Sequence, residues 1–164
     1  MSDAQFIKAP NNLRKAKIGN GPGKLDPSVL ARAEKVIENI QATYTDWADE
    51  ELTALDAVVA RLTAEEGDQG ADLKVLYTLS LDMKGSGGSF GYLMMSEVAA
   101  SLNDFLQGKE ALAKLDIEVV AAHVSALRAI YAESIRDDGG NMGRALLVGL
   151  EKIVAKANAA SASD

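Results

Sequence analysis

The sequence predicts an all-α fold, an antiparallel bundle of five or six helices joined by short loops. Three observations support this prediction. Apolar residues recur at helical spacing, no stretch alternates apolar and polar residues as a strand does, and aromatic residues make up only 5% of the chain. The 164 residues suffice for one domain with a substantial core, which we expect to span residues 26–157.

Residues 1–25 have the composition of a flexible basic N-terminal arm. They contain five lysine or arginine residues against a single acid, Asp3, and several Pro, Gly and Asn residues that favour turns and coil. The net charge of this segment is +4 and that of the whole chain is −7, so the remaining residues carry a net charge of −11. Such an acidic body argues against nucleic acid as the partner. We expect a disordered tail at residues 158–164.

The first helices are marked by capping residues and by apolar spacing. Asp26 is a good N-cap, Pro27 suits the first helical position, and Leu30, Ala33 and Ile37 follow at helical intervals. The pattern resumes after Tyr44, and we expect a break near Tyr44 and Thr45, with Thr45 capping a second helix.

Four further segments complete the predicted bundle. Residues 65–70 read as a loop, and a third helix follows from about Ala71. A fourth helix begins near Leu93 and ends at Gly108. The fifth begins near Asp116, and the sixth near Asn141.

A lysine and several glycines lie between the third and fourth helices, in the stretch LSLDMKGSGGSFGYL. Each glycine inside a helix costs roughly 1 kcal/mol relative to alanine, so close approach of another backbone or molecule must compensate. If Leu76 marks the centre of the buried face, Leu81, Gly85 and Gly88 fall together on the outer face. Lys84 lies at the edge of that face.

The outer face therefore has the properties of a binding surface for another protein. It combines an exposed leucine with positions that lack side chains, and a flexible cation stands beside them. Tyr77 borders the same face. We predict partner-binding roles for Tyr77, Leu81, Lys84, Gly85 and Gly88. The alternative is that the glycines form only a helix break where two helices pass closely.

The stretch from Asp82 to Gly91, DMKGSGGSFG, resembles the signature of histidine phosphotransfer (HPt) domains. In that family a Lys-Gly pair follows the phosphoacceptor histidine by three residues, and a second glycine comes six residues after the first. Lys84, Gly85 and Gly91 match this pattern. The resemblance covers about residues 45–155. It implies a four-helix bundle of HPt type with an additional N-terminal helix, and a role in two-component phosphorelay signalling.

The position of the phosphoacceptor histidine is occupied by Leu81, which has no nucleophilic atom. The resemblance therefore implies a pseudo-phosphotransfer protein rather than an enzyme. Such a protein would bind a response-regulator receiver domain or a histidine kinase without carrying phosphate. Two alternatives remain open at this point. An active phosphotransfer protein would use His123, and a helical bundle could be unrelated to phosphorelay.

Other kinds of site find little support in the sequence. The chain has no cysteine and one histidine, so we expect neither a disulfide nor a zinc site. The residues from Asp137 to Asn141 lack the remaining ligand positions of a calcium loop. No apolar run is long enough for a membrane span or a signal peptide, and we expect a cytoplasmic protein without membrane contact, metal or cofactor.

Overall fold

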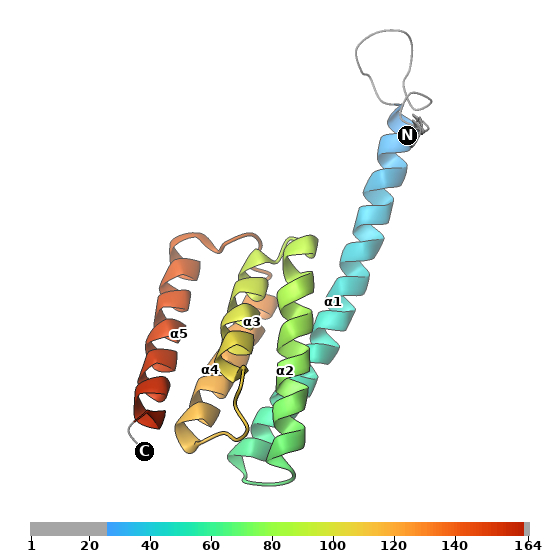
Figure 1. Cartoon of the computed structure of the whole chain (residues 1–164). Coiled ribbons are helices and arrows are strands. Elements are labelled where there is room, and N and C mark those ends of the chain that lie inside the picture. Colours follow the sequence, from blue (N-terminus) through green and yellow to red (C-terminus); the bar gives the residue numbers. More distant parts are fainter. Residues whose placement is uncertain (1–25, 163–164) are drawn as a thin grey trace, which may run out of the picture. The chain divides into compact units, whose positions relative to one another are not determined.

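The computed structural model of the chain describes residues 26–162, apart from the side chains of residues 38–45. Figure 1 shows that this part of the chain is all-helical, as the sequence predicts. The elements are α1 (Pro27–Thr63), α2 (Gln69–Ser86), the 3-10 helix η2 (Gly87–Phe90), α3 (Leu93–Leu106), α4 (Lys114–Ala132) and α5 (Gly140–Ser161). The expected arm at 1–25 and the last two residues of the expected tail lie outside the described residues. The α5 helix extends beyond residue 157, the expected end of the domain.

The predicted break at Tyr44 and Thr45 is wrong, because α1 is one continuous helix. No glycine or proline occurs between Ser28 and Glu66, so nothing in the backbone forces an interruption. The division of the chain into two compact units nevertheless falls at this place, between Thr43 and Tyr44.

Side-chain caps fix where two of the helices begin. The Asp68 carboxylate accepts hydrogen bonds from the backbone N–H groups of Gly70 (2.9 Å) and Ala71 (3.2 Å), so α2 begins two residues earlier than predicted. In the first turn of α4, the buried Asp116 accepts from the N–H of Ala113 at 3.0 Å and from the ammonium of Lys109 at 3.1 Å. These contacts satisfy N–H groups that a helix leaves unpaired at its start.

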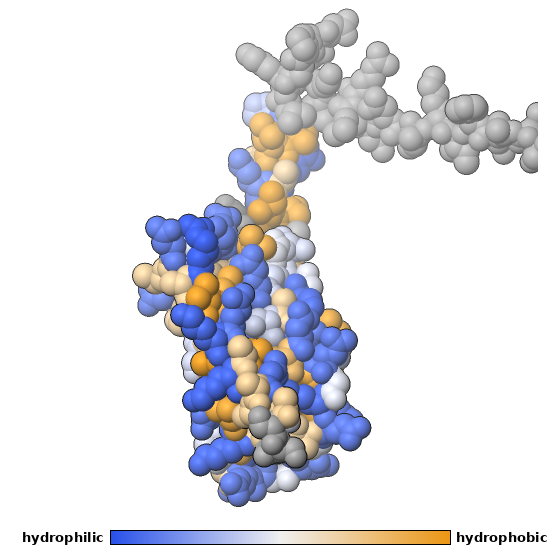
Figure 2. Space-filling view, turned by 60° about the vertical axis from the view of Figure 1, so that its left-hand side comes forward, coloured by the Kyte–Doolittle hydropathy of each residue, from blue (hydrophilic) through white to orange (hydrophobic). Residues whose placement is uncertain are grey.

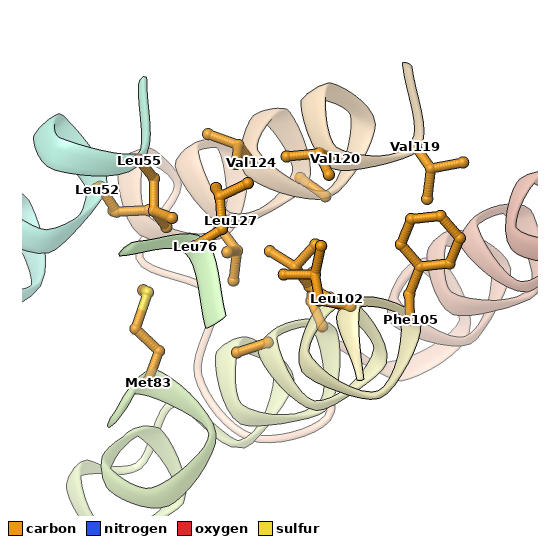
Figure 3. Close-up of a cluster of buried hydrophobic side chains, with 14 of the residues drawn as sticks. Leu52, Leu55, Leu76, Met83, Leu102, Phe105, Val119, Val120, Val124 and Leu127 are labelled. Carbon is orange, nitrogen blue, oxygen red and sulfur yellow. The ribbon is translucent and has the colours of Figure 1, made fainter. Parts of the chain in front are cut away.

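In the unit that begins at Tyr44, successive helices run in opposite directions and share one hydrophobic core (Figure 1). Figure 3 shows side chains from four helices meeting there, and these residues are almost completely buried. Labelled examples are Leu52 and Leu55 of α1, Leu76 and Met83 of α2, Leu102 and Phe105 of α3, and Val119, Val120, Val124 and Leu127 of α4. Burial of each such side chain stabilises the fold by about 1.5–3 kcal/mol.

Polar contacts hold α1 against its neighbours at the rim of this core. The guanidinium of Arg128 on α4 contacts three residues of α1: Asp56 at 2.7 Å, Asp49 at 2.8 Å and Thr53 at 3.0 Å. Arg61 of α1 pairs with the buried carboxylate of Asp72 on α2. Both contacts engage an arginine with more than one hydrogen bond, which fixes the geometry better than a single ion pair does.

Candidate functional site

The candidate site is the outer face of α2 and the adjoining turn of η2. It is formed by Tyr77, Leu81, Lys84 and Gly85 of α2 and by Gly88 of η2, and we call it the α2 face. Leu81 is 46% exposed and Tyr77 is 37% exposed, and both glycines lie at the surface. On the opposite side, the side chains that point into the core are fully covered; these are Leu76, Ser80 and Met83. The rotational setting of α2 predicted from the apolar spacing is therefore confirmed.

The glycines of the segment have different structural reasons for being glycine. A Cβ atom on Gly87 would lie 3.0 Å from both the Ser96 hydroxyl and the Tyr92 carbonyl oxygen, so a side chain would fit only if these neighbours shifted. Gly91 has a φ of +80°, a conformation that favours glycine. By contrast, a Cβ on Gly85 would meet nothing within 4 Å, and one on Gly88 would make only ordinary contacts at 3.8–3.9 Å. The fold favours glycine at positions 87 and 91 and leaves room for a side chain at positions 85 and 88.

Ser96 of α3 forms hydrogen bonds with the backbone at the C-terminal end of α2. Its hydroxyl accepts a hydrogen bond from the N–H of Gly88 at 2.9 Å and donates one to the carbonyl of Lys84 at 2.8 Å. The last carbonyls of a helix have no partner within it, so this contact satisfies one of them. Close packing at Gly87 brings the serine near enough to do so. Ser96 thereby fixes the backbone that carries Lys84, Gly85 and Gly88.

The loop between α4 and α5 holds the far end of the glycine segment. The N–H of Asp137 donates to the carbonyl of Gly91 at 3.1 Å, and the Asp137 carbonyl accepts from the N–H of Met94 at 2.9 Å. Arg136 lies over the ring of Tyr92, 4.0 Å from its centroid, and donates to the carbonyl of Phe90 at 3.0 Å. The turn after α2 is thus anchored on both sides.

A buried polar cluster sets the position of Tyr77. The Asn103 amide of α3 donates to the Tyr77 carbonyl and to the Ser80 hydroxyl, both at 3.1 Å. The Ser80 hydroxyl in turn donates to the Tyr77 carbonyl at 3.0 Å. Because Asn103 is 4% exposed, these bonds are protected from water and hold α2 in register with α3.

The lysine of the α2 face has a partner that the sequence did not indicate. The Lys84 ammonium lies 2.9 Å from the carboxylate of Asp104 on α3, and both side chains are accessible to solvent. Ion pairs of this exposed kind contribute at most about 1 kcal/mol, so little energy holds the ammonium to Asp104. Lys84 is available to another anion at small cost.

Leu93 extends the α2 face beyond its predicted limits. The sequence pattern places Leu93 with the apolar residues of its helix, yet its side chain is 44% exposed. It lies next to Gly88, because a Cβ atom there would come within 3.9 Å of the Leu93 side chain. Leu93 therefore adds a second exposed leucine to this surface, next to Gly88. No residue near Leu93 in sequence signals this exposure.

One edge of the α2 face is acidic. Asp82 is exposed beside Leu81, and the half-buried Glu51 of α1 lies close enough to be affected by its charge. Burial of Glu51 raises the pKa of its carboxyl, and the charges of Asp82 and Glu50 raise it further. The buried Oε2 atom of Glu51 has no hydrogen-bond partner among the described residues.

The single histidine lies far from the surface. The ring of His123 is fully buried between α3 and α4. Nδ1 donates to the carbonyl of Val119 at 2.8 Å, which leaves the neutral Nε2 to accept from the Ser101 hydroxyl at 3.0 Å. Both nitrogens are occupied and shielded, so a phosphoryl donor has no access to them in this fold.

Comparison with protein-family models, curated proteins and solved structures gave no match to this chain. Across the residues that the structure describes, none of the helices combines the length and the apolar character that crossing a bilayer requires.

The environment of His123 predicts a pH-dependent stability. Burial lowers the pKa of His123 below its usual 6.5, so the folded protein binds fewer protons than the unfolded chain. His123 therefore stabilises the fold above about pH 6.5, and this contribution is lost as the pH falls through 6.5 toward the folded value. His123→Gln should lose less stability than the wild type between about pH 7.5 and pH 5.5. Urea unfolding at both pH values measures this, and equal losses would contradict the assignment.

Proposed function

We propose that this protein is a pseudo-phosphotransfer protein of two-component signalling. It binds a response-regulator receiver domain or a histidine kinase through the α2 face and carries no phosphate. In this proposal α2 to α5 form a four-helix bundle of HPt type, and α1 is the additional N-terminal helix. Support comes from the resemblance of the Asp82–Gly91 stretch to the HPt signature and from the placement of its residues. Phosphorelay partners act at cytoplasmic domains, so we place the protein in the cytoplasm.

The observation that carries the proposal is the exposure of Leu81. Its side chain stands 46% exposed on the face where the family signature would place a reactive histidine. Burial of a leucine side chain normally stabilises a fold, yet Leu81 is left exposed. The neighbouring Gly85 and Gly88 leave room around it. A leucine between bare backbone positions is suited to insertion into an apolar pocket of a docking partner.

The same residues favour binding over transfer. Phosphoryl transfer from a receiver aspartate breaks the acyl P–O bond and forms a new bond to a nucleophilic nitrogen, which Leu81 does not offer. Lys84 supplies a cation beside this position, three residues along the helix. It can attract the acidic phosphorylation pocket of a receiver without any chemical step. In this role the protein competes for that partner or tethers it.

The two alternative readings receive less support. Use of His123 would require opening of the core between α3 and α4, because both ring nitrogens are bonded inside it. A purely structural role explains Gly87 and Gly91, but it explains neither the open space at Gly85 nor the exposure of Leu81.

Replacement of Leu81 by aspartate should abolish docking without harming the fold. Val148→Asp on α5 is the matched control, since Val148 is 47% exposed and lies outside the α2 face. We expect binding of at least one receiver domain or kinase dimerisation domain from the source cell, measured by biolayer interferometry. Leu81→Asp should weaken it by more than about tenfold, because a charge would replace an apolar side chain that the partner covers. Equal affinities of the two variants, or no binding by the wild type, would refute the proposal.

Restoration of a histidine tests the missing chemistry. The wild type should take up no phosphoryl group from a radiolabelled receiver phosphate, whereas Leu81→His should take up a measurable amount. The Leu81→His, Asp104→Asn double variant should accept phosphate faster, since the Asp104 carboxylate repels an incoming phosphoryl group and occupies Lys84. Detection of alkali-stable label on the wild-type chain would contradict the proposal.

A further inference from the structure

A cavity of about 600 Å³ lies at the end of the bundle where α1 ends and α4 begins, within the unit that starts at Tyr44. Its volume is in the range of sites that hold small molecules. Apolar residues of the two helices and of the loop before α4 line it: Leu62, Leu112, Ile117 and Ala121. The residues that line the cavity do not include those of the α2 face, so it is separate from the surface that we propose for docking.

The wall of the cavity is fixed by the side chain of Gln69. Its amide nitrogen donates to the carbonyl of Leu112 at 3.1 Å, and its amide oxygen accepts from the N–H of Leu112, also at 3.1 Å. These two bonds hold the start of α2 against the loop before α4. Leu62 and Leu112 are almost completely buried beneath the cavity, so its apolar floor is formed before any ligand arrives.

Glu65, at the rim, occupies a position where the backbone favours glycine. The N–H of Glu66 donates to the carbonyl of Arg61 at 2.9 Å, and the N–H of Glu65 donates to the carbonyl of Leu62 at 3.3 Å. This pair of bonds is a common way to end a helix, and it puts Glu65 in the left-handed region with a φ of +56°. A residue with a Cβ atom adopts this conformation at an energetic cost, so glycine would end α1 more favourably.

The charges of Glu65 and Glu66 are also unfavourable for the end of α1. Both carboxylates follow the C-terminus of the helix, the negative end of its dipole, where cations are stabilising and anions are not. Hydrophilic side chains cover much of the surface drawn in Figure 2, so charge by itself does not mark a site. These two residues differ because their positions, and for Glu65 the backbone conformation, oppose the stability of the fold.

The rim of the cavity carries negative charge that the fold leaves uncompensated. Glu118 of α4 adds a third carboxylate, against the one ammonium of Lys114, so the residues that line the cavity have a net charge of −2. Among the residues that the structure describes, none of these four side chains takes part in an ion pair. An acidic rim around an apolar floor attracts a ligand that is both cationic and apolar.

We propose that this cavity binds a small organic cation in which a protonated amine is joined to an apolar body. The apolar body lies over Leu62, Ile117 and Ala121, and the ammonium group lies at the rim beside Glu65 and Glu66. Residues that break a local rule of stability are expected where function requires them. A bound cation compensates the carboxylates at the end of α1, whereas an uncharged or anionic molecule of similar shape does not.

Titration of the full chain with tryptamine, followed through the backbone amide NMR shifts, tests this proposal. The uncharged tryptophol and the anionic indolepropionate are control ligands of similar shape. Tryptamine should bind with a dissociation constant of about 1 mM or lower, tryptophol about fivefold more weakly, and indolepropionate more weakly still. The largest shifts should fall at Leu62, Ile117 and Ala121. Equal binding of tryptamine and tryptophol, or no saturation by tryptamine, would overturn the proposal.

A matched pair of glycine substitutions separates binding from stability. Ser134 ends α4 with the same pair of hydrogen bonds, to Tyr131 from its own N–H and to Ile130 from the next residue, and its φ is +50°. It lies outside the cavity. Glu65→Gly and Ser134→Gly should each raise the melting temperature by about 2–4 °C, because glycine suits the left-handed conformation.

Only one of the two variants should change ligand binding. Glu65→Gly should weaken tryptamine binding by about threefold or more, because it removes one carboxylate from the rim, and Ser134→Gly should bind as the wild type does. A lower melting temperature of Glu65→Gly would mean that this glutamate serves the fold, and unchanged tryptamine binding would mean that it does not serve a ligand. Either result would overturn the proposal.

Discussion

The close contact between Gly87 and Ser96 is the constraint on which the candidate site depends. Glycine at position 87 permits this contact without any shift, since an added Cβ would approach both the serine hydroxyl and the Tyr92 carbonyl at 3.0 Å and would push them apart. That approach lets one hydroxyl accept from Gly88 and donate to Lys84 across the end of α2. The geometry of the α2 face follows from this bridge between α2 and α3.

Because this turn is fixed by hydrogen bonds on both sides, its backbone keeps exposed apolar side chains at the surface. The Ser96 bridge holds one side of the segment, and the contacts of Asp137 and Arg136 hold the other. Leu81 and Leu93 are consequently presented at the surface by backbone that packing elsewhere determines. Binding through preorganised groups loses less conformational entropy than binding through a mobile loop, which suits a surface whose role is docking alone.

Much of the fold follows from local sequence, because apolar spacing and capping residues act within a few positions of each other. The setting of α2, with Leu76 inside and Leu81 outside, needed only the helical repeat. The failed break at Thr45 shows the limit of this reasoning. A capping residue permits a helix to begin but does not compel the preceding helix to end, and no glycine or proline is present there to end it.

The parts of the site that the sequence could not predict depend on contacts between helices. Ser96 and Asp104 come within hydrogen-bond distance of α2 only because α3 folds back against it. The exposure of Leu93, at the start of α3, and the complete burial of His123, in the middle of α4 against α3, are decided by how the helices pack together. Sequence spacing identifies the face of a helix, whereas packing decides which positions along that face are covered.

The most direct test of the account is the thermal unfolding of Gly85→Ala. Our central claim is that the open surface beside Leu81 is not required by the fold, which does not need a glycine at position 85. An alanine there would meet no atom within 4 Å and would favour the helix by up to about 1 kcal/mol. We therefore predict a higher melting temperature than that of the wild type, by several degrees. A lower melting temperature would mean that Gly85 serves the fold itself, and would contradict the claim.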